Sequence, residues 1–321
     1  MRAIVLGDPT YFRIKAGNNP HTRNRWGLRQ SVSLEKAIRQ WKRLKDQLSE
    51  LGVKVLVVPP EKDWPGMVFP ANAGVVMDQE GLRPFSEKIF LMSRLNQGRC
   101  GEEFYYQKFF EKLGFKIEGV DCPFEGEADF FQAGSYTIFT YGRIIRPHFK
   151  LRWGLPPYER VYGFRTDFIF LEKVKKYISP EKILPLELID ERFYHGDTVC
   201  CSFGLHRQYV MSYLLALSSE SQEVLKNAFG EKLIALSGED AFRYAANSFY
   251  LETDEGRFLL IPQGLSRRLL DQLVERAMIP IEIDVSEFYE KGGGSIKCMI
   301  LDLGPVFDKE QLLKLKNDFD H

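Results

Sequence analysis

The stretch QWKRLKDQLSELG (residues 40–52) is followed directly by VKVLVVPP (residues 53–60). This succession of two segments indicates the unit from which the whole fold is built. The first part has apolar residues at helical spacing and ends in glycine, which is typical of a helix that stops there. The second part is a short apolar run typical of a buried strand. After a loop, VFPANAGVV (residues 68–76) predicts a second strand that opens with polar residues.

The same order of helix, strand, loop and strand recurs four more times, as a repeat of pattern rather than of letters. The later copies are EEFYYQKFFEKLG, FKIEGVD and FEGEADFFQAG; TDFIFLEKVKKYI, ILPLELID and FYHGDTVCCSFG; SQEVLKNAFG, EKLIALSG and AANSFYLE; and SRRLLDQLVERAM, IPIEIDV and GGGSIKCMILDLG. We expect an α/β protein of five similar units that close into a ring. An open, doubly wound sheet is the alternative, although neither GxGxxG nor GxxxxGK[ST] is present to support it.

Composition indicates a water-soluble globular chain. Of its 321 residues, 44% are hydrophobic and 27% are charged, and no linker or low-complexity segment divides them. We therefore expect a single domain over residues 1–321, with a lid loop at residues 146–160, around HFKLRWGLPP, and a helical tail at residues 308–321.

Charge and the N-terminus restrict partners and location. Lys plus Arg and Asp plus Glu are both 44, so no net field draws the chain to nucleic acid or to an anionic membrane. The N-terminal stretch has no apolar run typical of a signal peptide, and we expect a cytoplasmic protein. The composition leaves both a monomer and a homo-oligomer open.

The five cysteines argue against a disulfide framework and against a structural metal site. Their number is odd and no CxxC spacing occurs, so neither paired disulfides nor a tetrahedral zinc site is expected. The cysteines are Cys100, Cys122, Cys200, Cys201 and Cys298.

One polar residue lies near the start of the second strand in each unit. These residues are Asn72, Glu127, His195, Asn247 and Cys298, spaced about 50 to 70 residues apart. If the units form a ring, equivalent positions converge on its axis, so five distant segments can build one site.

Cys298 and His195 are the residues with the strongest chemical signal. Three glycines (Gly292–Gly294) precede the cysteine, and such a bend allows close approach of a ligand and exposes N–H groups that favour a thiolate. A nucleophilic thiolate needs a base, and only His195 among the five histidines has a ring-facing position. An inert buried cysteine and a core histidine bonded to a carbonyl are the alternatives.

Carboxylates are dense beside this pair. Asp197 follows the histidine in FYHGDT, and FEGEADFF carries Glu125, Glu127 and Asp129. Acidic side chains inside aromatic strands are costly to bury unless they bind a charged group. These carboxylates are therefore candidates for orienting the histidine and for binding a charged substrate.

The motifs VFPANAGVV, GEADFF, YGFRTD, FYHGDT and GGGSIKCM, in this order, resemble the amidinotransferase, or guanidino-group-modifying, superfamily. That superfamily includes arginine deiminase, dimethylarginine dimethylaminohydrolase, arginine–glycine amidinotransferase and bacterial arginine dihydrolase. The similarity extends from about Asp8 to Leu303. It implies the pentein fold, a five-bladed α/β propeller, which agrees with the ring expected from the repeat.

The resemblance implies that Cys298 is the nucleophile and His195 the general acid and base. The acidic partner of the histidine would lie in FEGEADFF, where Glu127 is preferred and Glu125 stays open. The family usually reads acid-Gly-Gly-Asp there, whereas this chain has Glu-Gly-Glu-Ala-Asp.

The resemblance also implies a set of substrate-binding residues. Arg165 in YGFRTD would hold the substrate α-carboxylate, and Arg99 would be a second pocket arginine, with Arg94 as its competitor. Asp197 would grip the guanidinium, and Asp129 is a further acidic group for the charged substrate.

Asn72 departs from deiminases and dimethylarginine hydrolases, in which an aspartate binds the cationic guanidinium. The amide in ANAG, together with Asn19 before Pro20, is similar to bacterial arginine dihydrolases. An amide both donates and accepts hydrogen bonds, so Asn72 and Asn19 could retain neutral citrulline for a second hydrolysis. The alternative is that Asn72 only caps a tight turn.

We therefore expect a cysteine-dependent hydrolase of a small guanidino compound, with arginine dihydrolase as the preferred activity. Arginine would become ornithine, ammonia and carbon dioxide through a covalent thiouronium adduct, without a metal or an organic cofactor. The alternatives are an amidinotransferase, a deiminase, a dimethylarginine dimethylaminohydrolase and a binding protein without turnover.

Overall fold

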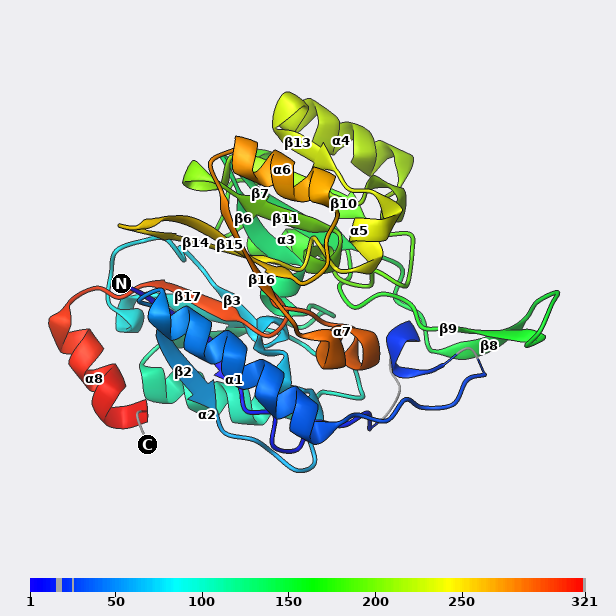
Figure 1. The fold of residues 1–321 in the computed structure, drawn as a ribbon. Coiled ribbons are helices and arrows are strands. Elements are labelled where there is room, and N and C mark those ends of the chain that lie inside the picture. The colour runs from blue at the N-terminus through cyan, green and yellow to red at the C-terminus, as the bar shows by residue number, and fades with distance from the viewer. Residues whose placement is uncertain (16–18, 25, 320–321) are drawn as a thin grey trace.

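The computed structural model describes residues 1–15, 19–24 and 26–319. Figure 1 shows a mixed α/β molecule in which helices lie outside several small sheets. Among the described residues, five of these sheets have three strands each. They are β17 (Leu301–Pro305), β1 (Arg2–Gly7) and β2 (Lys54–Val58); β3 (Gly74–Val76), β4 (Ile89–Met92) and β5 (Lys116–Gly119); β6 (Phe130–Ala133), β7 (Tyr136–Tyr141) and β10 (Ile183–Glu187); β11 (Cys200–Phe203), β12 (Tyr209–Ser212) and β13 (Leu233–Ala235); and β14 (Phe249–Thr253), β15 (Gly256–Pro262) and β16 (Ile279–Ile283).

The five sheets share one topology. In each, the central strand is antiparallel to one neighbour and parallel to the other. In four sheets the antiparallel neighbour is the preceding strand of the chain, and in the fifth it is the last strand, β17. A parallel pair needs a crossover connection, which a helix usually provides. The crossover helices are α1 (Leu34–Glu50), α2 (Glu102–Leu113), α3 (Phe170–Val174), α4 (Ser219–Phe229) and α6 (Arg267–Glu275).

The helices and the two predicted strands of each unit are confirmed, but the unit has a third strand that the sequence analysis did not predict. The missing strands are the central ones, such as β12, which follows β11 after a short 3-10 turn (Leu205–Arg207). Three of them, β7, β12 and β15, follow the preceding strand after a short connection, whereas β4 follows a longer loop and β1 lies at the other end of the chain from its antiparallel partner β17. Without pairing information, a short apolar run cannot be assigned to a separate strand.

Helix α1 illustrates why these helices form. Its buried residues Ala37, Trp41, Leu44 and Leu48 recur every three or four positions and therefore lie on one face. Gly52 follows the helix with a φ of +76°, a backbone conformation that favours glycine.

Both ends of the chain contribute to one sheet. β1 pairs with β17 in antiparallel fashion and with β2 in parallel fashion. The first and last strands are thus hydrogen-bonded neighbours, as Figure 1 shows near the N-terminus. This pairing fixes the segment just before β17 against the N-terminal part of the molecule.

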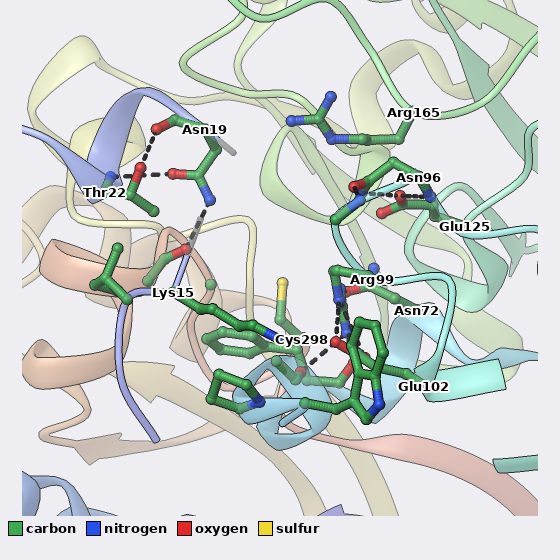
Figure 2. A pocket seen from close by; sticks show the side chains of 18 of the residues that line it. Lys15, Asn19, Thr22, Asn72, Asn96, Arg99, Glu102, Glu125, Arg165 and Cys298 are labelled. Atoms are coloured by element: carbon green, nitrogen blue, oxygen red, sulfur yellow. Dashed lines mark hydrogen bonds and ion pairs between the residues drawn. The ribbon is translucent and has the colours of Figure 1, made fainter. Parts of the chain in front are cut away.

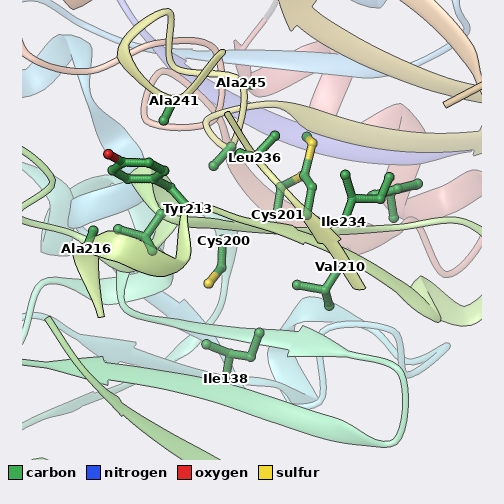
Figure 3. Close-up of a cluster of buried hydrophobic side chains, with 14 of the residues drawn as sticks. Ile138, Cys200, Cys201, Val210, Tyr213, Ala216, Ile234, Leu236, Ala241 and Ala245 are labelled. Atoms are coloured by element: carbon green, nitrogen blue, oxygen red, sulfur yellow. The ribbon is translucent and has the colours of Figure 1, made fainter. Parts of the chain in front are cut away.

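Apolar side chains from the five units fill separate buried clusters. The largest includes residues of β11, β12 and β13, and Figure 3 shows Cys200 and Cys201 within it, beside Ile138, Val210 and Ile234. Burial raises the pKa of each of these two thiols to about 12, so they remain protonated core residues near neutral pH.

The segment expected to be a lid loop is a β-hairpin in the structure. β8 (His148–Leu151) and β9 (Tyr158–Val161) pair with each other, and Figure 1 shows them projecting from the body. The side chain of Trp153 at the tip is fully exposed. Next to the tip, where Tyr158 pairs with Leu151, the hydroxyl of Tyr158 donates to the carbonyl oxygen of Trp26 at 3.2 Å, which ties the hairpin to the N-terminal loop.

The expected helical tail is α8 (Lys309–Phe319), and residues 320–321 of that prediction lie outside the described residues. Leu315 is buried, and the ring of Phe319 packs edge-on against Phe109 with centroids 5.3 Å apart. The two remaining helices are α5 (Gly238–Phe242) and α7 (Ser286–Gly292). Of the helices in the described parts of the chain, none combines the length and the apolar character needed to cross a membrane.

Candidate active site

A cavity of about 100 Å³ brings together residues from distant parts of the chain. Figure 2 shows the sulfur of Cys298 pointing into the space between Asn19, Arg165 and Arg99. The cavity lining includes Asn19, Asn72, Asn96, Arg99, Glu125, Arg165, Tyr194, His195 and Cys298. Six of the nine predicted site residues therefore line one cavity, and Glu127, Asp129 and Asp197 do not.

The triple glycine has a steric role beside Cys298. Helix α7 ends at Gly292, and Gly293 follows in the left-handed conformation with a φ of +82°. A Cβ atom on Gly294 would lie 2.9 Å from the Cβ of Cys298, which is closer than side chains tolerate. Glycine at these positions lets the chain leave the helix and pass directly over the cysteine.

The side chains of Asp197 and Asn247 form hydrogen bonds with the sulfur of Cys298. The thiol donates to Oδ2 of Asp197 at 3.1 Å, and Nδ2 of Asn247 donates to the sulfur at 3.1 Å. Burial and the neighbouring Asp197 carboxylate raise the pKa of the Cys298 thiol well above its ordinary value. The cysteine is therefore protonated at neutral pH in this state.

The prediction that Glu127 partners His195 is wrong in this structure. Nε2 of His195 lies 2.8 Å from Oε2 of Glu125, and both side chains are buried. The other oxygen of Glu125 accepts a hydrogen bond from the side chain of Asn96 at 2.7 Å. The open alternative, Glu125, is thus the carboxylate that orients the imidazole.

Glu127 lies in a different environment. Its carboxylate forms an ion pair with Lys297 at 2.9 Å and accepts a hydrogen bond from the backbone N–H of Asp302 at 3.0 Å. The reason is the geometry of the turn: Glu125 and His195 each stand five residues before a strand, β6 or β11. Glu127 holds the position equivalent to Asp197, two residues later in its turn.

Charges around the imidazole set its protonation. Burial alone would lower the pKa of His195, but the carboxylates of Asp129, Glu125 and Asp197 outweigh burial and raise this pKa. In Glu125, burial opposes ionisation, yet the hydrogen bond and charge of His195 hold the carboxyl pKa well below its usual range. Both shifts favour an imidazolium facing a carboxylate.

Asp129 supports the turn instead of facing the cavity. Its two oxygens accept hydrogen bonds from the hydroxyls of Thr140 at 2.6 Å and Thr166 at 2.7 Å, and from the backbone N–H of Gly196 at 2.8 Å. Because Gly196 follows His195, these bonds fix the backbone that carries the imidazole.

Asp197 lies beside the sulfur and has unused hydrogen-bonding capacity. Burial raises its pKa to about 6, although His195 and the thiol of Cys298 act in the opposite direction. While Oδ2 accepts from the thiol, Oδ1 is buried and has no hydrogen-bond partner among the described residues. A buried carboxylate oxygen without a donor is costly unless a ligand supplies one.

Asn72 is held in one orientation by Arg99. Nη1 of Arg99 donates to Oδ1 of Asn72 at 2.6 Å, while its other nitrogens pair with Glu102 and with backbone carbonyls. An arginine can only donate, so the amide oxygen must face it and the amide nitrogen must face away. Nδ2 of Asn72 is buried without a hydrogen-bond partner in the described part of the chain. The side chain therefore does not cap its own turn.

Arg165 and Asn19 are two further residues that line the cavity. The guanidinium of Arg165 stands over the ring of Tyr194, 5.3 Å from its centroid, and extends toward the cavity in Figure 2. Nδ2 of Asn19 donates to the carbonyl of Gly292 at 2.8 Å. Arg94, the competitor of Arg99, pairs with the backbone of Phe124 and lines a separate cavity.

Several site residues were not assigned a role from the sequence. Asn96 and Glu102 lie in and just after SRLNQGR, where only arginines were considered. Asn247 was recognised as a ring-facing residue, but its contact with Cys298 depends on tertiary structure. Within the described ranges, no group of three or more His, Cys, Asp or Glu side chains is arranged to hold a metal ion.

The fold and the Cys–His–Glu set define the amidinotransferase, or guanidino-group-modifying, superfamily. The family model described as "N,N dimethylarginine dimethylhydrolase, eukaryotic" matches residues 8–139 and 162–304. The chain belongs to this dimethylarginine dimethylaminohydrolase family. The unmatched segment between the two ranges contains the β8–β9 hairpin.

Individual relatives differ in their named activities. The bifunctional arginine dihydrolase/ornithine cyclodeaminase ArgZ of Synechocystis is 33% identical over 93% of this chain, which spans only 37% of that protein's length. The N(G),N(G)-dimethylarginine dimethylaminohydrolase of Mycobacterium tuberculosis is 27% identical to this chain. The alignment covers 95% of this chain and 86% of that protein.

A solved structure resembles almost the whole chain. The N-terminal domain of an ArgZ variant covalently bound to a reaction intermediate superposes with a TM-score of 0.78 at 28% identity. The match covers 96% of this chain and 99% of that domain. The mixed α/β fold of this chain therefore matches the pentein structures.

Proposed function

We propose that this chain is a cysteine-dependent hydrolase of guanidino groups that converts arginine to ornithine, ammonia and carbon dioxide by two successive hydrolyses. One observation carries the proposal. The amide donor Nδ2 of Asn72 and the carboxylate acceptor Oδ1 of Asp197 are both buried without a hydrogen-bond partner in the described structure. Asn72 lines the cavity that contains Cys298, and Asp197 accepts a hydrogen bond from the Cys298 thiol.

This pair of atoms suits a neutral ureido group. The ureido oxygen of citrulline can accept from Asn72, while its NH₂ group can donate to Asp197. A guanidinium has donors only, so a site built for it alone would present acceptors on both sides. The fixed donor of Asn72 supports retention of citrulline after the first hydrolysis, which is what a second hydrolysis requires.

The first hydrolysis begins with the protonated thiol of Cys298. A cationic guanidinium beside the sulfur favours the thiolate, and the proton passes to Oδ2 of Asp197, which already accepts a hydrogen bond from the thiol. The thiolate attacks the guanidinium carbon, and His195, as imidazolium, protonates the departing ammonia. Neutral His195 then takes a proton from water, which attacks the thiouronium adduct and releases citrulline.

The second hydrolysis repeats these steps on the ureido carbon. Thiolate attack and loss of a second ammonia leave a carbamoyl group on Cys298, and water releases it as a carbamate that yields ornithine and carbon dioxide. In this proposal Arg165 binds the α-carboxylate of the substrate. Its guanidinium extends toward the cavity beside Tyr194, which supports that role. Arg99 acts indirectly on the guanidino end of the substrate, because it orients the side chain of Asn72.

We also propose that the five three-stranded sheets are the blades of a closed five-bladed propeller within one catalytic domain. Their common topology and the pairing of β1 with β17 support this arrangement. A propeller closed by its terminal strands explains why residues from all five units surround Cys298. A crystal structure with an open row of sheets would contradict it.

The proposed activity is tested by incubating purified protein with arginine and quantifying ornithine, citrulline and ammonia. Ornithine with two ammonia per arginine is expected, and citrulline with one ammonia would contradict the second hydrolysis. Formation of ornithine only when an amine is added, without release of ammonia, would indicate an amidinotransferase instead. A parallel assay with dimethylarginine in place of arginine tests the activity for which the Mycobacterium relative is named.

Two variants make this assay specific. Cys298→Ser should abolish all turnover, because the nucleophile is lost. Asn72→Asp places an acceptor where the ureido oxygen needs a donor, so we expect citrulline to accumulate, with the second step slowed by at least about tenfold. Unchanged ornithine production by the aspartate variant would remove the support drawn from Asn72.

A further inference from the structure

Asn247 has no role in the proposed reaction, yet its side chain contacts the reacting sulfur. The residue is completely buried on the turn before β14. Its Nδ2 donates to Sγ of Cys298 at 3.1 Å and to the carbonyl of Asp197 at 3.0 Å. Its Oδ1 accepts from the backbone N–H groups of Ser295 at 2.9 Å and Cys298 at 3.1 Å.

The orientation of this amide is determined by its partners. Backbone N–H groups only donate, so the oxygen must face Ser295 and Cys298 and the nitrogen must face the sulfur. With two hydrogen bonds donated and two accepted, the buried amide has its hydrogen-bonding capacity satisfied. The backbone carbonyl of Asn247 also accepts from the N–H of Lys297 at 3.1 Å, so side chain and main chain hold the same loop.

The sulfur therefore has neighbours with opposite preferences. The Asp197 carboxylate accepts the thiol proton and favours the thiol, whereas an N–H donor favours the thiolate. The hydrogen bond from Asn247 lowers the Cys298 pKa, against the larger effects of burial and Asp197. The titratable groups near the sulfur are Glu125, Tyr194, His195, Asp197 and Tyr244, with Arg99, Arg165 and Lys297 as further charges.

We propose that Asn247 is a catalytic residue that stabilises negative charge on the sulfur of Cys298, both when the thiolate forms and when it leaves the adduct. No bond to Asn247 is made or broken. The sulfur's electron pair attacks the substrate carbon as described above, and the amide N–H remains its hydrogen-bond donor in each ionised state. This role rests on the proposed function, in which Cys298 is the nucleophile.

The test measures the ionisation of Cys298 without any guanidino substrate. Iodoacetamide forms an S–C bond with thiolate and releases iodide, so its rate against pH reports the thiol pKa. The experiment uses a Cys100→Ser background, because Cys100 is the exposed cysteine of the five. Peptide mass spectrometry locates the modification at Cys298.

Asn247→Asp is close in shape, keeps an oxygen for the two backbone N–H groups and replaces the donor with an acceptor. We expect the apparent pKa of Cys298 to rise by at least about one unit, and kcat to fall about 10²-fold, as for loss of a single stabilising donor. Asn247→Ser, with a hydroxyl in place of the amide, serves as a second variant and should show a smaller shift in the same direction.

Ser248→Ala is the matched control, because its hydroxyl donates to the carbonyl of Ala245 in the same turn and does not touch the sulfur. It should lower thermal stability without changing the Cys298 pKa. A folded Asn247 variant whose alkylation profile matches that of the parent would overturn the proposal and leave Asn247 a structural residue. Because alkylation needs no turnover, this result stays separate from failure of the arginine assay.

Discussion

Glu125 and Glu127 are two positions apart, yet one orients the imidazole and the other forms an ion pair with Lys297. The deciding factor is the turn before β6, which places alternate residues on different sides. The same turn before β11 separates His195 from Asp197. Two acidic residues of equal chemistry thus acquire different functions from backbone geometry alone.

Replacing Glu125 with Gln should lower the pKa of His195. Negative charge near the ring favours imidazolium, so removing a carboxylate makes the ring lose its proton at lower pH. We expect the alkaline limb of the kcat profile to move to lower pH and kcat at neutral pH to fall about 10²-fold. The measurement is the pH dependence of ammonia release. Glu127→Gln is the control, and an equal shift in that variant would contradict the assignment.

Gly294 should not tolerate a side chain. An alanine Cβ would stand 2.9 Å from the Cβ of Cys298, so the cysteine or its loop must move. Since small displacements of a reacting group are costly, Gly294→Ala should reduce kcat/KM by at least about tenfold. Gly119→Ala is a suitable control, because a Cβ there meets no atom within 4 Å. Comparable steady-state kinetics for both variants would argue against tight packing over Cys298.

Among the elements, the β8–β9 hairpin and α8 are additions at the periphery of the five units. The hairpin lies outside the family match, and its strands pair only with each other in the sheets described. A two-stranded hairpin alone is marginally stable in water, so its link to the N-terminal loop through Tyr158 is significant. That loop carries Asn19, which contributes to the cavity lining.

Helix α8 should contribute to stability through one buried side chain. Leu315 is 2% exposed, whereas Leu313 on the same helix is 59% exposed. We expect Leu315→Ala to reduce the free energy of unfolding by about 2–4 kcal/mol, and Leu313→Ala to change it by less than about 0.5 kcal/mol. Urea unfolding followed by circular dichroism measures both. Equal small effects would show that the helix is not docked in solution.

For the molecule as a whole, a charge cluster around the buried Asp302 adds side-chain contacts to the pairing of the first and last strands. Oδ1 of Asp302 on β17 accepts from Nε of Arg2 on β1 at 2.6 Å, and Arg207 lies 3.5 Å from Oδ2. Burial opposes ionisation of Asp302, but Arg2, followed by Arg207 and Lys297, lowers the carboxyl pKa below its ordinary value. This cluster joins the two ends of the chain.

Asp302→Asn should therefore destabilise the folded protein by about 3 kcal/mol at neutral pH, because Arg2 and Arg207 lose a buried carboxylate and keep only the more exposed Glu80 as an acidic partner. A carboxyl with a lowered folded pKa stabilises the fold above its unfolded pKa, and this contribution is lost as pH falls through the folded pKa. The difference between parent and variant should thus shrink in acid. Asp271→Asn, which breaks an exposed pair with Arg267, is the control and should change stability by less than about 1 kcal/mol. A pH-independent difference would exclude the charge explanation.

Much of this architecture could be predicted from the chain, because helix periodicity and apolar runs are local properties. The order of the crossover helices and of their flanking strands, and the convergence of Cys298 and His195 on one cavity, followed from such patterns. The central strands did not, because strand pairing is needed to recognise them. The form of the 146–160 segment likewise depended on pairing between β8 and β9.

The sequence by itself determined which residue types were available to the site and in which turns they stand. Only the tertiary structure decided that Glu125, not Glu127, meets His195, that Arg99 turns the Asn72 donor inward, and that Asn247 reaches the sulfur. The physical reason is that a hydrogen bond requires its two atoms to lie within about 3 Å of each other. These partners are 27 to 70 residues apart in the sequence, so their contact depends on how distant backbone segments are placed. Local pattern carries no information about that direction.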